Sequence, residues 1–294
     1  MASQYRFGLS LFLSTFFASC CLAQQAPQQQ PPAQQQVQQP PPVEPAVLED
    51  GGLSIEPIYW FNRAQPDLRG GAAATEFGSI SYPGNANRSI GGELGVPAGR
   101  SNTLRFSYFR TQGNANTTVS QTASIFGEGY SPGDYIVANY RLQSAKISWD
   151  YLSYTWHKRS GPIRLKTLYE VQFATISTNF AAPLKPVTTD SSGNTDDNTA
   201  HGSKNVFDPT FGVTLDQPIG HHFRWELTGS GFGIPHHGNI WDAQADIAVH
   251  FKQFELLAGE KAFHFKTSAR GDEYFTDTLS GVFVGLRYYW GRQE

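Results

Sequence analysis

The side chains with the greatest potential for acid–base or metal chemistry are the histidines. Two adjacent pairs occur, His221–His222 and His236–His237. Roughly a dozen residues of extended chain, at about 3.3 Å each, separate the pairs, so they cannot share one metal ion. Within a pair, adjacent strand residues point to opposite faces, which also disfavours a shared ligand. We interpret them as solvated loop histidines and predict no metal site.

Catalytic groups are equally sparse. The stretch 190–198 offers carboxylate and amide oxygens, but it lacks the alternating spacing and the closing glutamate of a calcium loop. The segment Gly229–Gly233 resembles a phosphate-binding loop only in its glycines, because no helix follows it. The remaining acid–base candidates match no catalytic motif: His201, His236, His237, Asp190, Asp196 and Asp197. We therefore predict no catalytic residue and no cofactor.

Charge and cysteine content exclude further classes of function. The 294 residues contain 22 Lys+Arg and 25 Asp+Glu, a net charge of -3. No basic excess is available to neutralise phosphates, so a nucleic-acid partner is not expected. The only two cysteines, Cys20 and Cys21, lie near the N-terminus, which excludes a cysteine-based zinc domain. What remains is a chain rich in aromatic residues (14%) and poor in charged ones (16%).

The first 50 residues are expected to direct and space the protein rather than to fold. Residues 1–23 have the pattern of a secretory signal peptide, with Arg6 before an apolar run and a small residue, Ala23, at the expected cleavage site. The segment Phe17–Cys20 resembles a bacterial lipobox, so lipidation of Cys20 is an open alternative. Residues 24–50 are dominated by Gln and Pro and are predicted to form a disordered spacer.

The elements that must position the remaining side chains are strands. From Leu53 onward, apolar residues alternate with polar ones instead of recurring at helical spacing. In 163–173, for example, Ile163, Leu165 and Tyr169 share one face, while Arg164, Lys166 and Glu170 share the other. Ten strands are predicted: 52–61, 87–96, 103–111, 142–156, 163–178, 206–215, 223–233, 239–251, 254–267 and 276–290. All 6 tryptophans fall inside these strands, several near an end, where rings favour the level of lipid headgroups.

Long and short connections between these strands alternate. The long ones, 62–86, 112–141 and 179–205, fall at one end of the sheet, and the short turns 97–102, 157–162, 216–222 and 252–253 fall at the other. Long strands, an even strand count and this asymmetry are typical of an antiparallel barrel that crosses a bilayer. A sheet can cross only if it closes, because hydrocarbon cannot satisfy unpaired backbone groups. We predict an all-β fold, a closed transmembrane barrel in residues 51–294, with about ten strands. Eight to twelve strands are allowed, because 119–140 could hold an extra hairpin.

The polar faces of the predicted strands carry charges of both signs. If the apolar faces meet lipid, these charges point into the barrel and are candidate pore-lining residues. A salt-bridged, closed lumen is the alternative arrangement of the same side chains. The set comprises Glu56, Arg105, Arg164, Lys166, Glu170, Arg224, Glu226, Asp242, Asp246 and Arg287.

The C-terminal segment Phe283–Trp290 resembles the assembly signal of bacterial outer-membrane β-barrel proteins. Gly285, Tyr288 and Trp290 occupy its glycine and hydrophobic positions, whereas Phe283 stands where a polar residue is common and four residues follow Trp290. The resemblance implies location in the bacterial outer membrane, with outer-membrane lipid and the barrel assembly machinery as partners. It also implies that the chain ends and short turns face the periplasm and the long loops face the exterior.

Three functions remain open at this stage. We expect porin-like passage of small solutes through a narrow charged lumen. The alternative is a closed barrel with a structural or surface-binding role through its long exterior loops. An outer-membrane hydrolase with its active site at the rim is a third, less favoured interpretation, so the chain is not expected to be an enzyme.

Overall fold

The computed structural model describes residues 52–64, 67–70, 79–81, 86–99, 101–126, 128–189, 193, 195–196, 198–220, 222–234, 238–267 and 273–290. The chain divides into two units, Met1–Val43 and Glu44–Glu294, and all described elements belong to the second. The predicted signal peptide and spacer lie outside the described residues. In the part of the chain that is described, no helix is long and apolar enough to cross a membrane.

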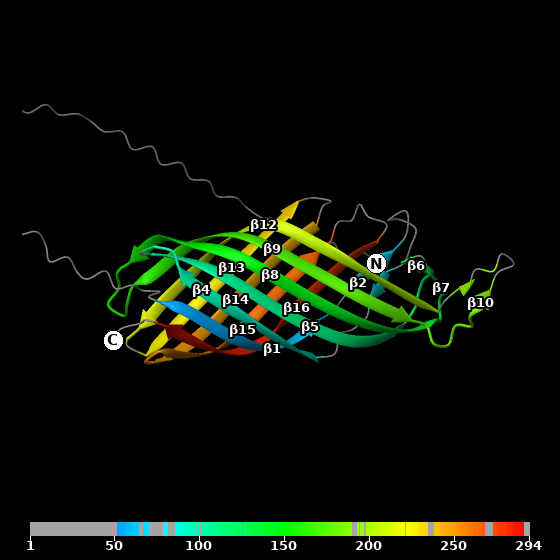
Figure 1. The fold of residues 1–294 in the computed structure, drawn as a ribbon, viewed down its shortest axis with the longest axis horizontal. Helices are drawn as coiled ribbons and strands as arrows, with labels where there is room; N and C mark the ends of the chain where they lie inside the picture. The colour runs from blue at the N-terminus through cyan, green and yellow to red at the C-terminus, as the bar shows by residue number, and fades with distance from the viewer. Residues whose placement is uncertain are drawn as a thin grey trace, which may run out of the picture. The chain divides into compact units, whose positions relative to one another are not determined.

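Ten antiparallel strands form a closed barrel (Figure 1). Each strand pairs with its neighbour in the chain, and the last strand pairs with the first, so the wall has no free edge. The wall strands are β1 (Leu53–Ala64), β4 (Ala86–Pro97), β5 (Asn102–Thr118), β8 (Tyr135–Trp156), β9 (Ile163–Ala181), β12 (Thr199–Ile219), β13 (Phe223–Ile234), β14 (Gly238–Phe251), β15 (Phe254–Lys266) and β16 (Glu273–Trp290). The predicted fold class and strand count are confirmed.

The predicted lengths of three strands are wrong. Much of the expected loops 112–141 and 179–205 is strand, because β5, β8 and β12 run well past their predicted ends. The expected turn 216–222 is shortened in the same way, since β12 continues to Ile219. The added segments of β5 and β12 carry Gln, Asn, Thr, Ser and His on their outward face, so the apolar–polar alternation that marks a strand is absent there.

Three small hairpins accompany the wall. The strands β2 (Asp67–Gly70) and β3 (Ser79–Ser81) extend the sheet beside β16, and β10 (Thr188–Thr189) pairs with β11 (Thr195–Asp196). The strands β6 (Ala123–Ile125) and β7 (Glu128–Tyr130) form the extra hairpin considered for 119–140. That hairpin forms a two-stranded sheet of its own, and Tyr135 begins β8 instead, so the wall keeps ten strands.

The two ends of the barrel differ, and we name them for their connections. The turn end carries the short connections, including Lys252–Gln253, where Lys252 adopts a positive φ of 54° in a two-residue turn. The loop end carries the long connections. There β4 pairs with β5 only as far as Ile90–Arg110, and β12 pairs with β13 only as far as Phe211–Gly231. The strands β5, β8, β9 and β12 therefore continue beyond the closed wall as a projecting sheet, towards β6, β7 and β10 in Figure 1.

The outer face of the closed wall is apolar, as predicted from the alternation. Its exposed side chains include Ile147, Tyr169, Val171, Leu227, Ile247 and Val284. Aromatic rings gather on this face near the turn end, where bilayer headgroups favour them: Tyr154, Trp156, Phe223, Phe251, Phe254 and Trp290. This surface suits a hydrocarbon environment and not water.

Candidate functional site

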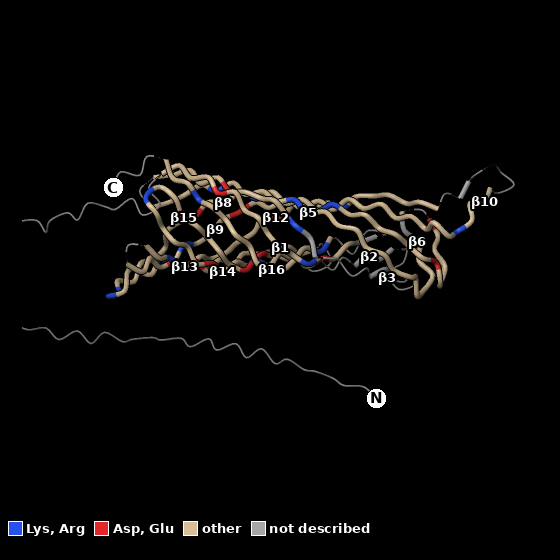
Figure 2. The backbone as a smooth tube through the Cα atoms, turned by 90° about the horizontal axis from the view of Figure 1, so that it is seen from below, with Lys and Arg blue, Asp and Glu red and all other residues tan. Residues whose placement is uncertain are grey.

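The lumen is sorted into two layers along the strands. Towards the turn end the inward side chains are mainly charged, and towards the loop end they are mainly apolar. On β9, for example, Arg164, Lys166 and Glu170 are followed by Ala174, Ile176 and Phe180, all buried. We call these layers the charged tier and the apolar tier. Figure 2 shows charged positions concentrated among the barrel strands and sparse along the sheet that projects towards β10.

All ten side chains proposed as pore-lining point into the charged tier. Nine are buried residues, and the side chain of Arg105 is 15% exposed. They pair extensively with one another and with inward carboxylates outside the predicted set. The structure therefore brings the predicted set together, as a network instead of an open ring.

Arg164 and Lys166 of β9 share one carboxylate. Arg164 donates two hydrogen bonds to Asp216 of β12, from Nε to Oδ1 at 2.6 Å and from Nη2 to Oδ2 at 3.0 Å. Lys166 Nζ lies 3.5 Å from the same carboxylate. Bidentate geometry is the strongest form of an ion pair. The sequence prediction misses Asp216 because it places this residue in a turn.

Arg287 of β16 connects three strands. Its Nε donates to Glu56 Oε2 on β1 at 2.5 Å, and its Nη1 lies 3.3 Å from Glu255 Oε2 on β15. Glu255 also accepts a hydrogen bond from the Tyr289 hydroxyl at 2.9 Å and lies 3.2 Å from Arg224 Nη2. This cluster fills the turn end of the lumen beside the seam where the barrel closes.

Two further ion pairs bridge the lumen between strands that are not neighbours. Lys146 Nζ of β8 lies 2.8 Å from Asp242 Oδ2 of β14 and 3.2 Å from Glu170 Oε1. Arg105 Nη1 of β5 lies 3.7 Å from Glu226 Oε1 of β13. Such contacts can form only if side chains meet across the interior, which leaves little free bore.

Arg105 also pairs along its own side of the wall, with Asp150 at 2.5 Å and Glu93 at 2.9 Å. Of the ten predicted residues, Asp246 makes no ion pair among the described residues, and it accepts a hydrogen bond from Gln244 at 3.0 Å. Extending the alternation to every strand would have found the missed members Glu93, Lys146 and Asp150, since each lies between outward apolar neighbours.

The sequence does not predict the apolar tier. Trp60 is expected near a headgroup level with the other tryptophans, but it is buried in the lumen and donates from Nε1 to the Gly281 carbonyl at 3.1 Å. Its ring lies edge-on to Phe109 of β5 at 5.4 Å, and Phe109 in turn contacts Phe263 of β15 at 5.0 Å. Because β5 and β15 are not neighbours, these rings cross the lumen. Phe283 also points into this tier and is buried. This apolar environment explains why an aromatic residue stands at a position of the C-terminal segment where a polar residue is common.

The hairpin β6–β7 packs against wall strands at the loop end, and we call it the mouth hairpin. Its Ala123 and Tyr130 are 1% exposed. The ring of Phe126 lies 6.3 Å from that of Phe275 on β16, and it packs so closely on Gly202 of β12 that a Cβ there would overlap it. The hairpin thus touches two wall strands that are not neighbours. A cavity of about 50 Å³ lies within the charged tier of the described residues, with room for a few water molecules.

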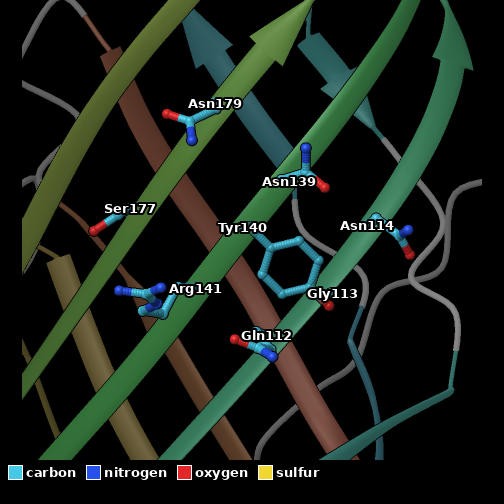
Figure 3. Close-up of a pocket in the computed structure, with 8 residues that line it drawn as sticks. All are labelled: Gln112, Gly113, Asn114, Asn139, Tyr140, Arg141, Ser177 and Asn179. Atoms are coloured by element: carbon cyan, nitrogen blue, oxygen red, sulfur yellow. The ribbon is translucent and has the colours of Figure 1, made fainter.

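A second candidate site lies outside the lumen, on the projecting sheet (Figure 3). Here a hollow of about 500 Å³ is lined by polar side chains in two cross-strand rows. One row is Gln112, Arg141 and Ser177, and the other is Asn114, Asn139 and Asn179, drawn from β5, β8 and β9. We call this the polar hollow. Amide, hydroxyl and guanidinium groups in such rows can bind the hydroxyl groups of a ligand.

The predicted histidine and rim candidates do not assemble a site in the described residues. His222 is exposed in a short turn, and His201 is an exposed residue of β12, not of a loop as expected. Asp196 falls in β11, and the other rim candidates (His236, His237, Asp190 and Asp197) lie outside the described residues, as does His221. Over the described ranges, no group of three or more His, Cys, Asp or Glu side chains could hold a metal ion.

No protein-family model matches the sequence, and no curated protein matches it. Solved structures do resemble the fold. The outer membrane protease OmpT of Escherichia coli superposes with a TM-score of 0.53 at 9% identity, covering 82% of this chain and 98% of that one. The attachment protein Ail of Yersinia pestis also matches, at TM-score 0.30 and 9% identity over 81% of this chain and 99% of that one.

Closure of the wall, the apolar outer belt and the superposition on OmpT agree. Each is expected for a chain that crosses a bilayer as a barrel, and bacterial outer membranes are where such barrels lie. The chain therefore has the fold of a bacterial outer-membrane β-barrel.

Proposed function

We propose that this protein is a closed barrel that anchors a surface-binding sheet, and that it is not an open porin. The observation that carries the proposal is the occupation of the lumen at every level: ion pairs in the charged tier, rings in the apolar tier and the mouth hairpin above them. Porin-like passage, which the charged inner faces first suggested, needs a continuous aqueous path that these cross-lumen contacts interrupt.

The binding surface in this proposal is the projecting sheet. It consists of the parts of four wall strands that continue beyond the closed wall, and it carries the polar hollow on its outer face. Its hydrogen-bonded strands hold the amide side chains in fixed rows, which lowers the entropy cost of binding a ligand. A rigid, polar surface beyond the apolar belt suits a partner in the aqueous phase.

Single-channel recording in planar bilayers tests the closed lumen. We expect the refolded protein to insert, to show heat-modifiable gel mobility and to give no stable conductance. Deleting 119–134 and replacing Phe109, Phe263, Lys146 and Asp242 with Ala should introduce conducting steps, because a path then opens through the mouth, the apolar tier and the charged tier. Regular steps from the wild-type protein, altered by Arg164→Ala or Glu170→Ala, would instead establish a narrow charged pore.

A further inference from the structure

We infer that the outer wall over β1, β4, β5 and β8 binds a phosphorylated, multiply acylated glycolipid of the outer leaflet. Three surfaces of different chemistry follow one another along these strands: an apolar groove, a row of arginines and the polar hollow. This inference concerns the outer wall and is independent of whether the lumen is closed.

The arginine row consists of Arg63 on β1, Arg88 on β4 and Arg110 on β5. All three are exposed on the outer face, and none has an ion-pair partner among the described residues. The register relates them stepwise, since Phe61 pairs with Arg88 and Ile90 pairs with Arg110. Each arginine is thus a diagonal neighbour of the next, a separation of roughly 7–8 Å on a sheet. One phosphate can therefore contact two of these side chains.

The strand tilt brings the three arginines to nearly one height. Because the strands are tilted, following the paired residues from one strand to the next also moves along the barrel axis. A line of partners that starts at Pro97, at the turn end of β4, ends at Ala64, at the loop end of β1, after passing through every other wall strand. With strands tilted by about 35–45°, residues at equal height are offset by about one residue per strand from the paired row. The arginines step in this direction by two residues per strand, so their heights differ by only a few ångströms.

The height of the row is that of a headgroup layer. When the same offset is applied around the barrel, the arginines lie at about the same height as Phe173 on β9 and Trp241 on β14. Both of these rings are exposed on the outer face. Rings in this position are expected where hydrocarbon gives way to headgroups. Arginines at that height can pair with lipid phosphates in bidentate geometry.

The apolar groove lies below the row, on the same strands. Gly92 and Ala145 recess the wall, and Leu94, Phe106, Tyr108 and Ile147 surround the recess, which has a volume of about 790 Å³. Because this surface faces hydrocarbon, an acyl chain is the occupant available to fill it. Arg110 directly follows Tyr108 on the outward face of β5 towards the loop end, and on β4 Ile90 separates the groove from Arg88.

The polar hollow continues the site into the aqueous phase. Gln112 follows Arg110 on the outer face of β5, and Arg141 pairs with Gln112 across to β8. Going outward, the wall thus offers apolar contact, positive charge and hydrogen-bonding amides. A lipid with acyl chains, phosphate and sugar presents the complementary groups in the same order.

Native mass spectrometry of the detergent-purified protein, titrated with diphosphoryl lipid A, tests the site. We expect Arg88→Ala with Arg110→Ala to weaken binding by about tenfold or more, since two charge-assisted contacts are lost. The exposed Arg159, in a turn at the opposite end, supplies the matched control, and Arg159→Ala should leave binding unchanged. Heat-modifiable mobility confirms that each variant is folded.

Two more probes separate the parts of the ligand. Filling the recess with Gly92→Leu should weaken binding of the acylated lipid while the arginines remain. We expect this variant to fold, because a Cβ at Gly92 would lie 3.4 Å from the Glu56 carbonyl oxygen, an ordinary contact, and heat-modifiable mobility checks that it does. Inorganic phosphate and a dephosphorylated lipid should both bind more weakly than the complete lipid. Equal binding by the double arginine variant, or equal competition by inorganic phosphate, would overturn the inference.

Discussion

Ion pairs bridge the lumen in the charged tier, whereas aromatic rings bridge it in the apolar tier. Lys146 and Asp242 meet across the barrel near the turn end, and Phe109 and Phe263 meet across it further along. Both arrangements leave little room for water, but they respond differently when a partner is lost. Removing a ring leaves a cavity, and removing one charge leaves its partner buried without compensation.

The comparison explains why a polar inner face need not mean a pore. Charges of both signs at matched positions pair across a narrow barrel, so the same residues that could line a channel fill it. The apolar tier adds a layer of mainly apolar side chains, and the mouth hairpin packs against it.

The largest expected effect comes from breaking the Arg287 cluster. Arg287→Ala leaves Glu56 and Glu255 buried beside each other with one counter-ion fewer, which should cost about 3–5 kcal/mol of the free energy of unfolding. Urea-induced unfolding in lipid vesicles, followed by tryptophan fluorescence, measures it. An effect below that of the exposed control Arg159→Ala would show that the pairs contribute nothing.

The apolar tier should respond to Phe263→Ala with a loss of about 3 kcal/mol or slightly more, from lost burial and the remaining cavity. The same unfolding measurement applies. Unlike the Arg287 variant, this one should show no dependence on ionic strength, because no charge is exposed or orphaned. A salt-dependent loss would contradict the distinction between the tiers.

Neutralising the charged cluster as a unit sharpens the contrast. Combining Arg287→Met with Glu56→Gln removes both members of that pair and leaves Glu255 paired with Arg224, so the loss should fall to within about 1–2 kcal/mol of the wild type. Additive losses across the two substitutions would mean that the side chains do not act as one network.

The smallest effect is expected at the mouth hairpin. In Gly202→Ala the new methyl meets the ring of Phe126, so the hairpin must shift, at a cost of about 1–2 kcal/mol. Limited proteolysis should then cleave 119–134 faster. Gly129→Ala, where a Cβ meets nothing within 4 Å, is the matched control and should leave the cleavage rate unchanged.

Much of the wall could be predicted from alternation. Ile163 to Glu170 indicate both faces of β9, and each of the ten predicted strands lies close to an observed one. Alternation predicts a strand only where one face of the strand contacts lipid and the other contacts a polar interior. In the projecting sheet both faces lose the contrast, so the pattern predicts loop at Asn114 and Asn139. In the apolar tier both faces are apolar, so Trp60 and Phe283 give no sign of pointing inward.

The sequence by itself determined the fold class, the closed wall and which charges face inward, because a strand has a period of two and a bilayer demands an apolar outer face and no free edge. The tertiary structure decided which side chains meet. Lys146 and Asp242 are 96 residues apart in the chain, and Arg287 and Glu56 are 231 apart. Their pairing depends on the register and closure of the whole barrel. A local sequence pattern contains no information about either.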